Sequence, residues 1–133
     1  MNYKNKDISN VSIPISLGEL IDKITILEIK IIHMTGVKLK NVKKELELLK
    51  SILKEKSTLV DINLIHNLKE INKNLWKIED HIRIKEANQE FDKEFIELAR
   101  SVYKENDKRA SIKKEINMKY NSELIEEKSY NQC

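Results

Sequence analysis

The sequence is poor in residues that interrupt or cross-link secondary structure. Its 133 residues include two glycines, one proline and one cysteine. So few turn-forming residues argue against a fold of many short strands. The single cysteine, Cys133, excludes a disulfide framework and a cysteine-based metal site. A reducing, cytoplasmic location is therefore expected.

Long apolar runs and a strong net charge are also missing. No apolar run approaches the roughly 18 residues that a membrane helix requires. The first ten residues, "MNYKNKDISN", lack the apolar core of a signal peptide. The 25 basic and 22 acidic residues are mixed along the chain and leave a net charge of +3. Such a weak field predicts neither a nucleic-acid partner nor a membrane partner.

What is abundant favours helices. Charged residues make up 35% of the chain, and apolar residues recur at helical spacing between them. Long helices with short connections indicate an up-and-down arrangement. We therefore predict one all-α domain over residues 1–133. It is an antiparallel bundle of about four helices with long third and fourth helices, an extended arm over residues 1–15 and a tail over residues 121–133.

Capping residues set the expected helix boundaries. Ser16 and Glu19 form an S-x-x-E capping box, which satisfies free amides at a helix start. Glycine favours the end of a helix because it adopts the left-handed conformation without strain. The expected helices run from near Leu17 to a stop at Gly36, from about Lys38 to Lys56, from a cap at Thr58 and Asp61 to about Ala87, and from a cap at Asp92 to about Tyr120.

The first expected helix is apolar on more than one side. Ile26 and Ile29 lie away from its main apolar stripe, which contains Leu20, Ile24 and Leu27. A helix of this kind is covered on two faces. We therefore expect a homodimer, in which a second copy covers the additional face.

Polar residues interrupt the apolar stripes of three helices. Because a buried charge is costly unless it is paired, the carboxylates among them should meet the cations. Two of them, Glu79 and Arg83, are also spaced to pair along one helix. The predicted charged inter-helical layer consists of Glu28, Glu79, Arg83, Asn106, Arg109 and Lys113.

This layer has two interpretations. It is either a structural ion-pair network or a polar cavity that binds a small anionic metabolite. Arg109 would offer a planar fork for a carboxylate or phosphate, and Lys113 would add a second charge. We take these six residues as the candidate ligand-binding set. No metal or cofactor is predicted, because the three histidines, one on the first expected helix and two on the third, show no i,i+4 pairing.

An enzyme is the alternative. Glu28 or Glu79 would act as acid or base if desolvated. Paired carboxylates such as Glu79 and Asp80 are compatible with a magnesium-dependent phosphohydrolase. A structural or partner-binding dimer is the third possibility.

Four stretches carry a resemblance to a known family. They are "VSIPISLGELIDKITILEIK", "LWKIEDHIR", "FIELARSVYKENDKRASIKKEIN" and "EEKSY". With them the chain resembles a family of small bacterial and phage proteins that is classed as a domain of unknown function, and this resemblance implies no activity. The helical pattern is also similar, more distantly, to the all-helical chorismate mutases, which bind a dicarboxylate between long helices. "LGELIDKITILEIK" lacks the arginines that those enzymes carry on their first helix.

Overall fold

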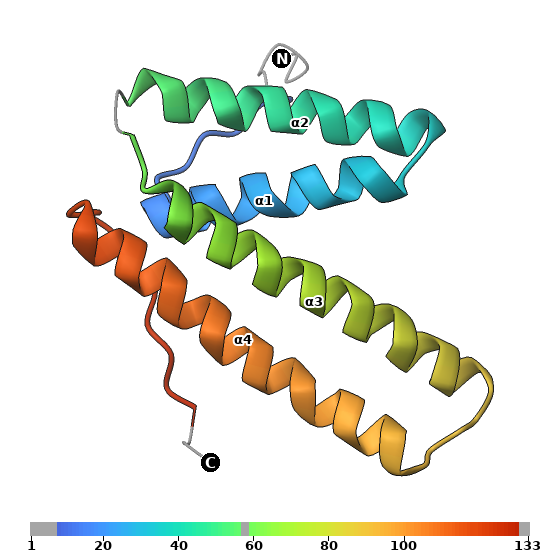
Figure 1. Cartoon of the computed structure of the whole chain (residues 1–133). Coiled ribbons are helices and arrows are strands. Elements are labelled where there is room, and N and C mark those ends of the chain that lie inside the picture. The colour runs from blue at the N-terminus through green and yellow to red at the C-terminus, as the bar shows by residue number, and fades with distance from the viewer. Residues whose placement is uncertain (1–7, 57–58, 131–133) are drawn as a thin grey trace, which may run out of the picture.

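The computed structural model describes residues 8–56 and 59–130, and within these ranges it contains helices and no strands (Figure 1). The predicted all-α class is therefore confirmed. Thr58, Cys133 and the first seven residues of the arm lie outside the described ranges. Residues 8–15 and most of 121–130 are irregular. The helices are α1 (Leu17–His33), α2 (Gly36–Glu55), α3 (Ile62–Ala87) and α4 (Lys93–Lys119).

Three helices begin at capping side chains that the sequence indicated. Ser16 Oγ accepts a hydrogen bond from the Glu19 amide at 3.1 Å. Asp61 and Asp92 accept equivalent bonds at the starts of α3 and α4. These bonds satisfy amides that have no partner within the first turn.

Gly36 was predicted to end the first helix, and this prediction is wrong. α1 already ends at His33, and Gly36 is the first residue of α2. Its φ of +63° lies in the left-handed region, which glycine adopts without strain. The glycine therefore serves the reversal between the two helices.

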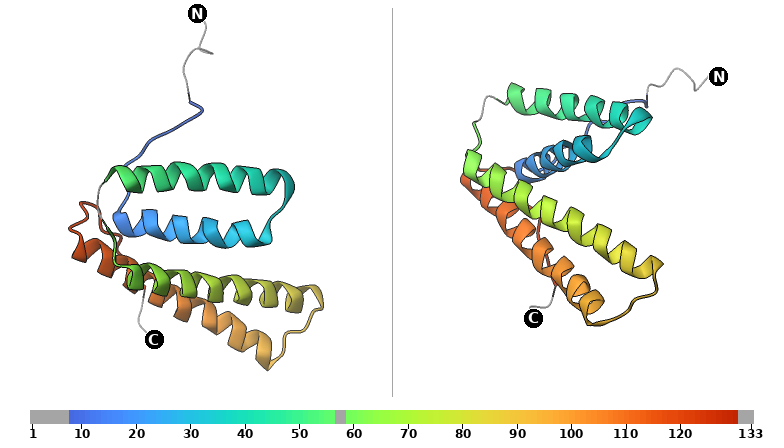
Figure 2. Two further views of the ribbon diagram at one scale, coloured as in Figure 1. Left: turned by 45° about the horizontal axis from the view of Figure 1, so that its top comes forward. Right: turned by 45° about the vertical axis from the view of Figure 1, so that its right-hand side comes forward.

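The four helices form two antiparallel hairpins arranged as a wedge. The α1–α2 hairpin and the α3–α4 hairpin lie close together where α1 and α3 begin and where α4 ends (Figure 1). They diverge toward the other end, as the right-hand view of Figure 2 shows. The irregular C-terminal tail leaves the end of α4 at the closed end of this wedge.

α1 is the central helix, since it contacts each of the other three. Leu20, Ile24 and Leu27 pack toward α2, whereas Ile21 packs between α3 and α4. Ile29, from the additional apolar side, is buried within the chain. That additional side therefore has an explanation that does not require a second copy.

The outer part of the α3–α4 hairpin has no comparable core. From Lys73 to Ile112, no residue falls in the buried class. Apolar side chains there are half-buried or exposed, because α1 ends before it can cover them. Among the described residues, no helix combines the length and apolar character needed to cross a membrane.

Candidate functional site

A fully buried carboxylate lies at the closed end of the wedge. Asp22 on α1 has no exposed surface. Arg109 on α4 binds both of its oxygens: the Nε donates to Oδ1 at 2.9 Å, and an Nη donates to Oδ2. This two-bond arrangement is the geometry in which a guanidinium holds a carboxylate most firmly. The hydrogen bond that Arg109 donates to Asp22 is the main reason why the pKa of Arg109 is raised.

α3 supplies the remaining donor to this carboxylate. The Asn72 amide donates to Asp22 Oδ1 and to Thr25 Oγ, both at 2.9 Å. The Thr25 hydroxyl in turn donates to the backbone carbonyl of Asp22 at 2.8 Å. Three helices are thus joined through one carboxylate, and its buried charge is both paired and hydrogen-bonded, as stability requires.

A second cation lies one turn further along α4. The Lys113 side chain is only 7% exposed and is surrounded by carboxylate oxygens. Its ammonium donates to Glu19 at 2.6 Å and to Glu126 at 3.3 Å, and it lies 3.9 Å from Asp22. Burial alone would lower the pKa of Lys113, but the bond to Glu19 and the surrounding negative charges outweigh it, so the pKa is raised.

The start of α1 is attached to the end of α4 and to the tail. Asn117 accepts a hydrogen bond from the Gly18 amide at 2.6 Å, and Ser122 accepts one from the Leu17 amide at 3.1 Å. A Cβ at Gly18 would lie 2.5 Å from the Lys113 carbonyl oxygen, so only glycine allows this approach. This close helix contact brings Lys113 within reach of α1.

The C-terminal tail contributes carboxylates to the same region. Glu126 binds Lys113, and its neighbour Glu127 binds Lys114 at 3.1 Å. The Glu126 side chain is 39% exposed, although the ammonium that it holds is nearly buried. An irregular segment therefore closes the solvent side of Lys113.

Of the six predicted residues, the structure brings three together. Arg109 and Lys113 belong to the Asp22 cluster, which we define as Glu19, Asp22, Thr25, Asn72, Arg109, Lys113, Asn117 and Glu126. Asn106 lies at its edge, where it accepts a hydrogen bond of 3.4 Å from Arg109.

The other three lie elsewhere. Glu28 pairs with Lys50 and Lys69 at 3.6 and 3.7 Å. Glu79 and Arg83 pair at 3.6 Å, as their spacing indicated, but both are exposed on the outer part of α3. No helix of the first hairpin extends that far, so the six residues do not form one layer.

The residues that were missed have only a weak signal in the sequence. Asp22 follows Gly18 by four residues and precedes Thr25 by three, so small and polar residues share one face of α1. Such a face resembles a solvated one. Glu19 was predicted as part of the capping box, yet its carboxylate reaches across to α4.

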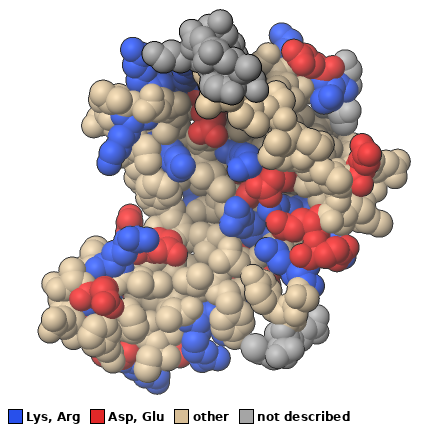
Figure 3. All heavy atoms as spheres, turned by 180° about the vertical axis from the view of Figure 1, so that it is seen from behind, with Lys and Arg blue, Asp and Glu red and all other residues tan. Residues whose placement is uncertain are grey.

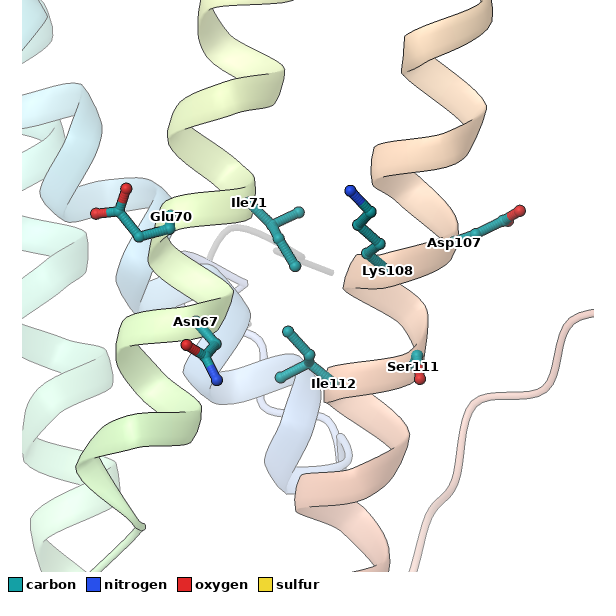
Figure 4. Close-up of a pocket in the computed structure, with 7 residues that line it drawn as sticks. All are labelled: Asn67, Glu70, Ile71, Asp107, Lys108, Ser111 and Ile112. Carbon is teal, nitrogen blue, oxygen red and sulfur yellow. The ribbon is translucent and has the colours of Figure 1, made fainter.

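A groove of about 650 Å³ lies between α3 and α4. Figure 4 shows Ile71 and Ile112 pointing toward one another across it, whereas Glu70 and Asp107 point away. Lys108 is the one labelled charged side chain that extends from α4 toward α3, so no set of charged groups converges on the groove. Within the described residues, no group of three or more metal-ligating side chains is found.

Charged side chains of both signs interleave over the middle of the face shown in Figure 3. This is the pattern of paired charges rather than of a surface of one sign. Within the described ranges, Glu105 Oε2 is the only buried side-chain nitrogen or oxygen without a hydrogen-bond partner. The Asp22 cluster is thus satisfied within the chain.

Comparison with known proteins gives a family and no activity. The family model described as "Family of unknown function (DUF6165)" matches residues 11–133. No curated protein and no solved structure matches the chain. The resemblance to a family without assigned activity is confirmed by this match.

Proposed function

We propose that this chain, which belongs to the DUF6165 family of unknown function, is a binding module for a small anionic metabolite. The metabolite would bind Lys113 and Arg109 at the position that the Glu126 carboxylate occupies. One observation carries the proposal. The nearly buried ammonium of Lys113 donates a hydrogen bond to the half-exposed carboxylate of Glu126, which belongs to an irregular tail. A ligand carboxylate or phosphate offers the same acceptor oxygens.

Glu126 is the replaceable member of the cluster. Asp22 and Glu19 are on α1, which is packed on two sides, so their positions are fixed by the core. The tail is attached near its start through Ser122 and further on through ion pairs of Glu126 and Glu127. The Glu127–Lys114 pair is exposed and contributes little to stability, and a ligand anion would replace the bond from Lys113 that Glu126 gives up. An incoming anion would therefore compete with the tail at modest cost.

Arg109 supports the same assignment. Its side chain is 28% exposed, although Asp22 is fully buried beneath it. A guanidinium has five N–H donors, of which the bonds to Asp22 use two and the bond to Asn106 uses a third. Two donors thus remain for a ligand beside Lys113.

The enzyme alternatives receive less support. A magnesium-dependent hydrolase needs clustered carboxylates, and the described residues contain no such metal-ligating group. A mutase-like site would need arginines on the first helix, whereas α1 contains none. A partner-binding dimer is the second candidate, because exposed apolar side chains remain on the outer part of the α3–α4 hairpin.

Calorimetric titration with succinate and with inorganic phosphate tests the proposal. Because the Glu126→Gln variant removes the competing carboxylate, we expect it to bind one of these anions about threefold to tenfold more tightly than the wild type. Glu127→Gln is the matched control, since it neutralises the adjacent tail carboxylate at an exposed lysine. Its affinity should equal that of the wild type.

Two results would contradict the proposal. One is that neither anion binds the folded Glu126→Gln protein. The other is that Glu127→Gln strengthens binding as much as Glu126→Gln does, because the effect would then reflect overall charge. Lys113→Met should abolish binding, and circular dichroism would show whether that variant is folded.

A further inference from the structure

A small cleft lies where the two hairpins begin to diverge. It has a volume of about 170 Å³ and lies between the end of α1 and the middle of α3. The divergence is visible in the right-hand view of Figure 2. The residues lining the cleft are Ile29, Ile32, His33, Lys73, Trp76, Lys77 and Asp80. None of them belongs to the Asp22 cluster.

One wall of this cleft is aromatic. The rings of His33 and Trp76 are stacked, with centroids 4.7 Å apart and an angle of 20° between their planes. Trp76 is only partly buried, because α1 ends at His33 and no further helix covers the indole. A partly exposed indole beside a cavity is a surface on which a planar ring can stack.

The rim of the cleft carries charge. Lys73 and Lys77 are one helical turn apart on α3, and Asp80 follows Lys77 by three residues. Lys73 pairs with the exposed Glu70 at 3.3 Å. Lys77 makes no ion pair within the described part of the chain. An anionic group at the rim would therefore lie near the ammonium groups of Lys73 and Lys77, of which the second makes no ion pair within the described residues.

We propose that this cleft binds a free mononucleotide. The base would stack against Trp76, the phosphate would bind Lys73 and Lys77, and Asp80 would accept a hydrogen bond from an amino group of the base. A cavity of this volume is smaller than the roughly 300 Å³ typical of sites that enclose a whole drug-sized ligand. It therefore holds one ring system and leaves the phosphate at the rim.

Trp76 makes the test direct, because it is the only tryptophan in the chain. Its fluorescence is followed during titration with adenosine monophosphate at fixed ionic strength. We expect saturable quenching with this probe, and weaker binding both with adenosine, which lacks the phosphate, and with ribose 5-phosphate, which lacks the base. Equal affinity for adenosine and adenosine monophosphate would overturn the role of the lysines.

Variants separate specific binding from general attraction. Lys77→Met should weaken binding of adenosine monophosphate by about tenfold, since one charge-assisted bond is lost. Lys44→Met is the matched control, because Lys44 is exposed on α2. Equal weakening by both variants would overturn the proposal.

Two further measurements complete the test. Calorimetry should detect no binding of adenosine monophosphate by Trp76→Leu, and unchanged affinity would exclude stacking on the indole. A short oligoadenylate that binds more tightly than adenosine monophosphate would assign the cleft to a nucleic-acid strand and overturn the assignment to a free mononucleotide.

Discussion

At the scale of single residues, the Asp22–Arg109 pair is the most consequential interaction in the molecule. Asp22 is fully buried. Without Arg109, the only remaining partners of its carboxylate would be the Asn72 amide and, at 3.9 Å, the Lys113 ammonium. Leaving one member of a buried ion pair without its partner costs far more than replacing both with apolar groups. The pair therefore tests whether the cluster serves stability.

Arg109→Met should lower the free energy of unfolding by about 3–5 kcal/mol, because it leaves the Asp22 carboxylate buried with too few partners. Urea unfolding would measure this loss. The double variant Asp22→Leu/Arg109→Met should recover most of it, since neither charge is then buried. If Arg109→Met were as stable as the wild type, the arginine would be retained for binding and not for the fold.

Residue roles were only partly predictable from the sequence. Arg109 and Lys113 were found because each interrupts an apolar stripe on a long helix. Asp22 was missed because its neighbours on α1 are small and polar, so its face looked solvated. Glu79 was included because it also interrupts a stripe, but that stripe runs beyond the end of α1. Periodicity identifies a face and does not identify what covers it.

At the scale of elements, the junction between α3 and α4 is held by charges. Lys85, near the end of α3, pairs with Glu90, Asp92 and Glu94 at distances of 3.0–3.2 Å. Asp92 is also the N-cap of α4. The Phe95 amide first, and then Lys85, lower the pKa of Asp92 below its ordinary value. The cap and one of the three ion pairs thus act on the same carboxylate, that of Asp92.

This depressed pKa predicts a loss of stability in acid. A carboxylate with a lowered folded-state pKa stabilises the fold above its unfolded pKa, and that contribution disappears as pH falls through the folded value. Thermal melts of the wild type should therefore show a falling melting temperature between about pH 5 and pH 2. Asp92→Asn keeps a good capping residue without the titrating group, so its curve should be flatter. Identical pH profiles for the two proteins would show that Asp92 does not contribute.

Helix boundaries were the most predictable feature because the capping side chains act within one turn. Ser16, Asp61 and Asp92 are adjacent in sequence to the amides that they satisfy. Gly36 was placed at the correct chain reversal but on the wrong helix. A glycine indicates where the chain can turn, but it does not indicate whether it ends the preceding helix or begins the following one.

At the scale of the whole molecule, the wedge could not be predicted from the sequence. The apolar faces of α1 were visible, and a second copy was expected to cover one of them. In the structure, Ile29 on that face is buried within the same chain and lines a cleft together with Trp76 of α3. The helix that packs on each face of α1 is decided by tertiary contacts such as the one between Gly18 and α4. No local sequence pattern encodes such contacts.

The wedge moves the expected dimer contact to a different place. Ile84, Phe91, Ile96 and Tyr103 are exposed on the outer part of the α3–α4 hairpin. Ile96 and Tyr103 are seven residues apart and so share one face of α4. The outer part of this hairpin has no buried side chain, so it gains stability when that face is covered, since burial of apolar surface is the main favourable contribution to folding and association. We therefore expect a homodimer formed through this region.

Sedimentation velocity over a range of concentrations tests this arrangement. The wild type should sediment as a dimer, and Ile96→Lys should weaken association by at least about tenfold, because a charge would replace an apolar contact in the interface. Leu59→Lys is the control, since Leu59 is even more exposed than Ile96, at 94% against 54%, but lies in the connection between α2 and α3. A wild type that remains monomeric at every concentration would contradict the expectation. So would a Leu59→Lys protein that dissociates as readily as Ile96→Lys, because the contact would then involve both hairpins.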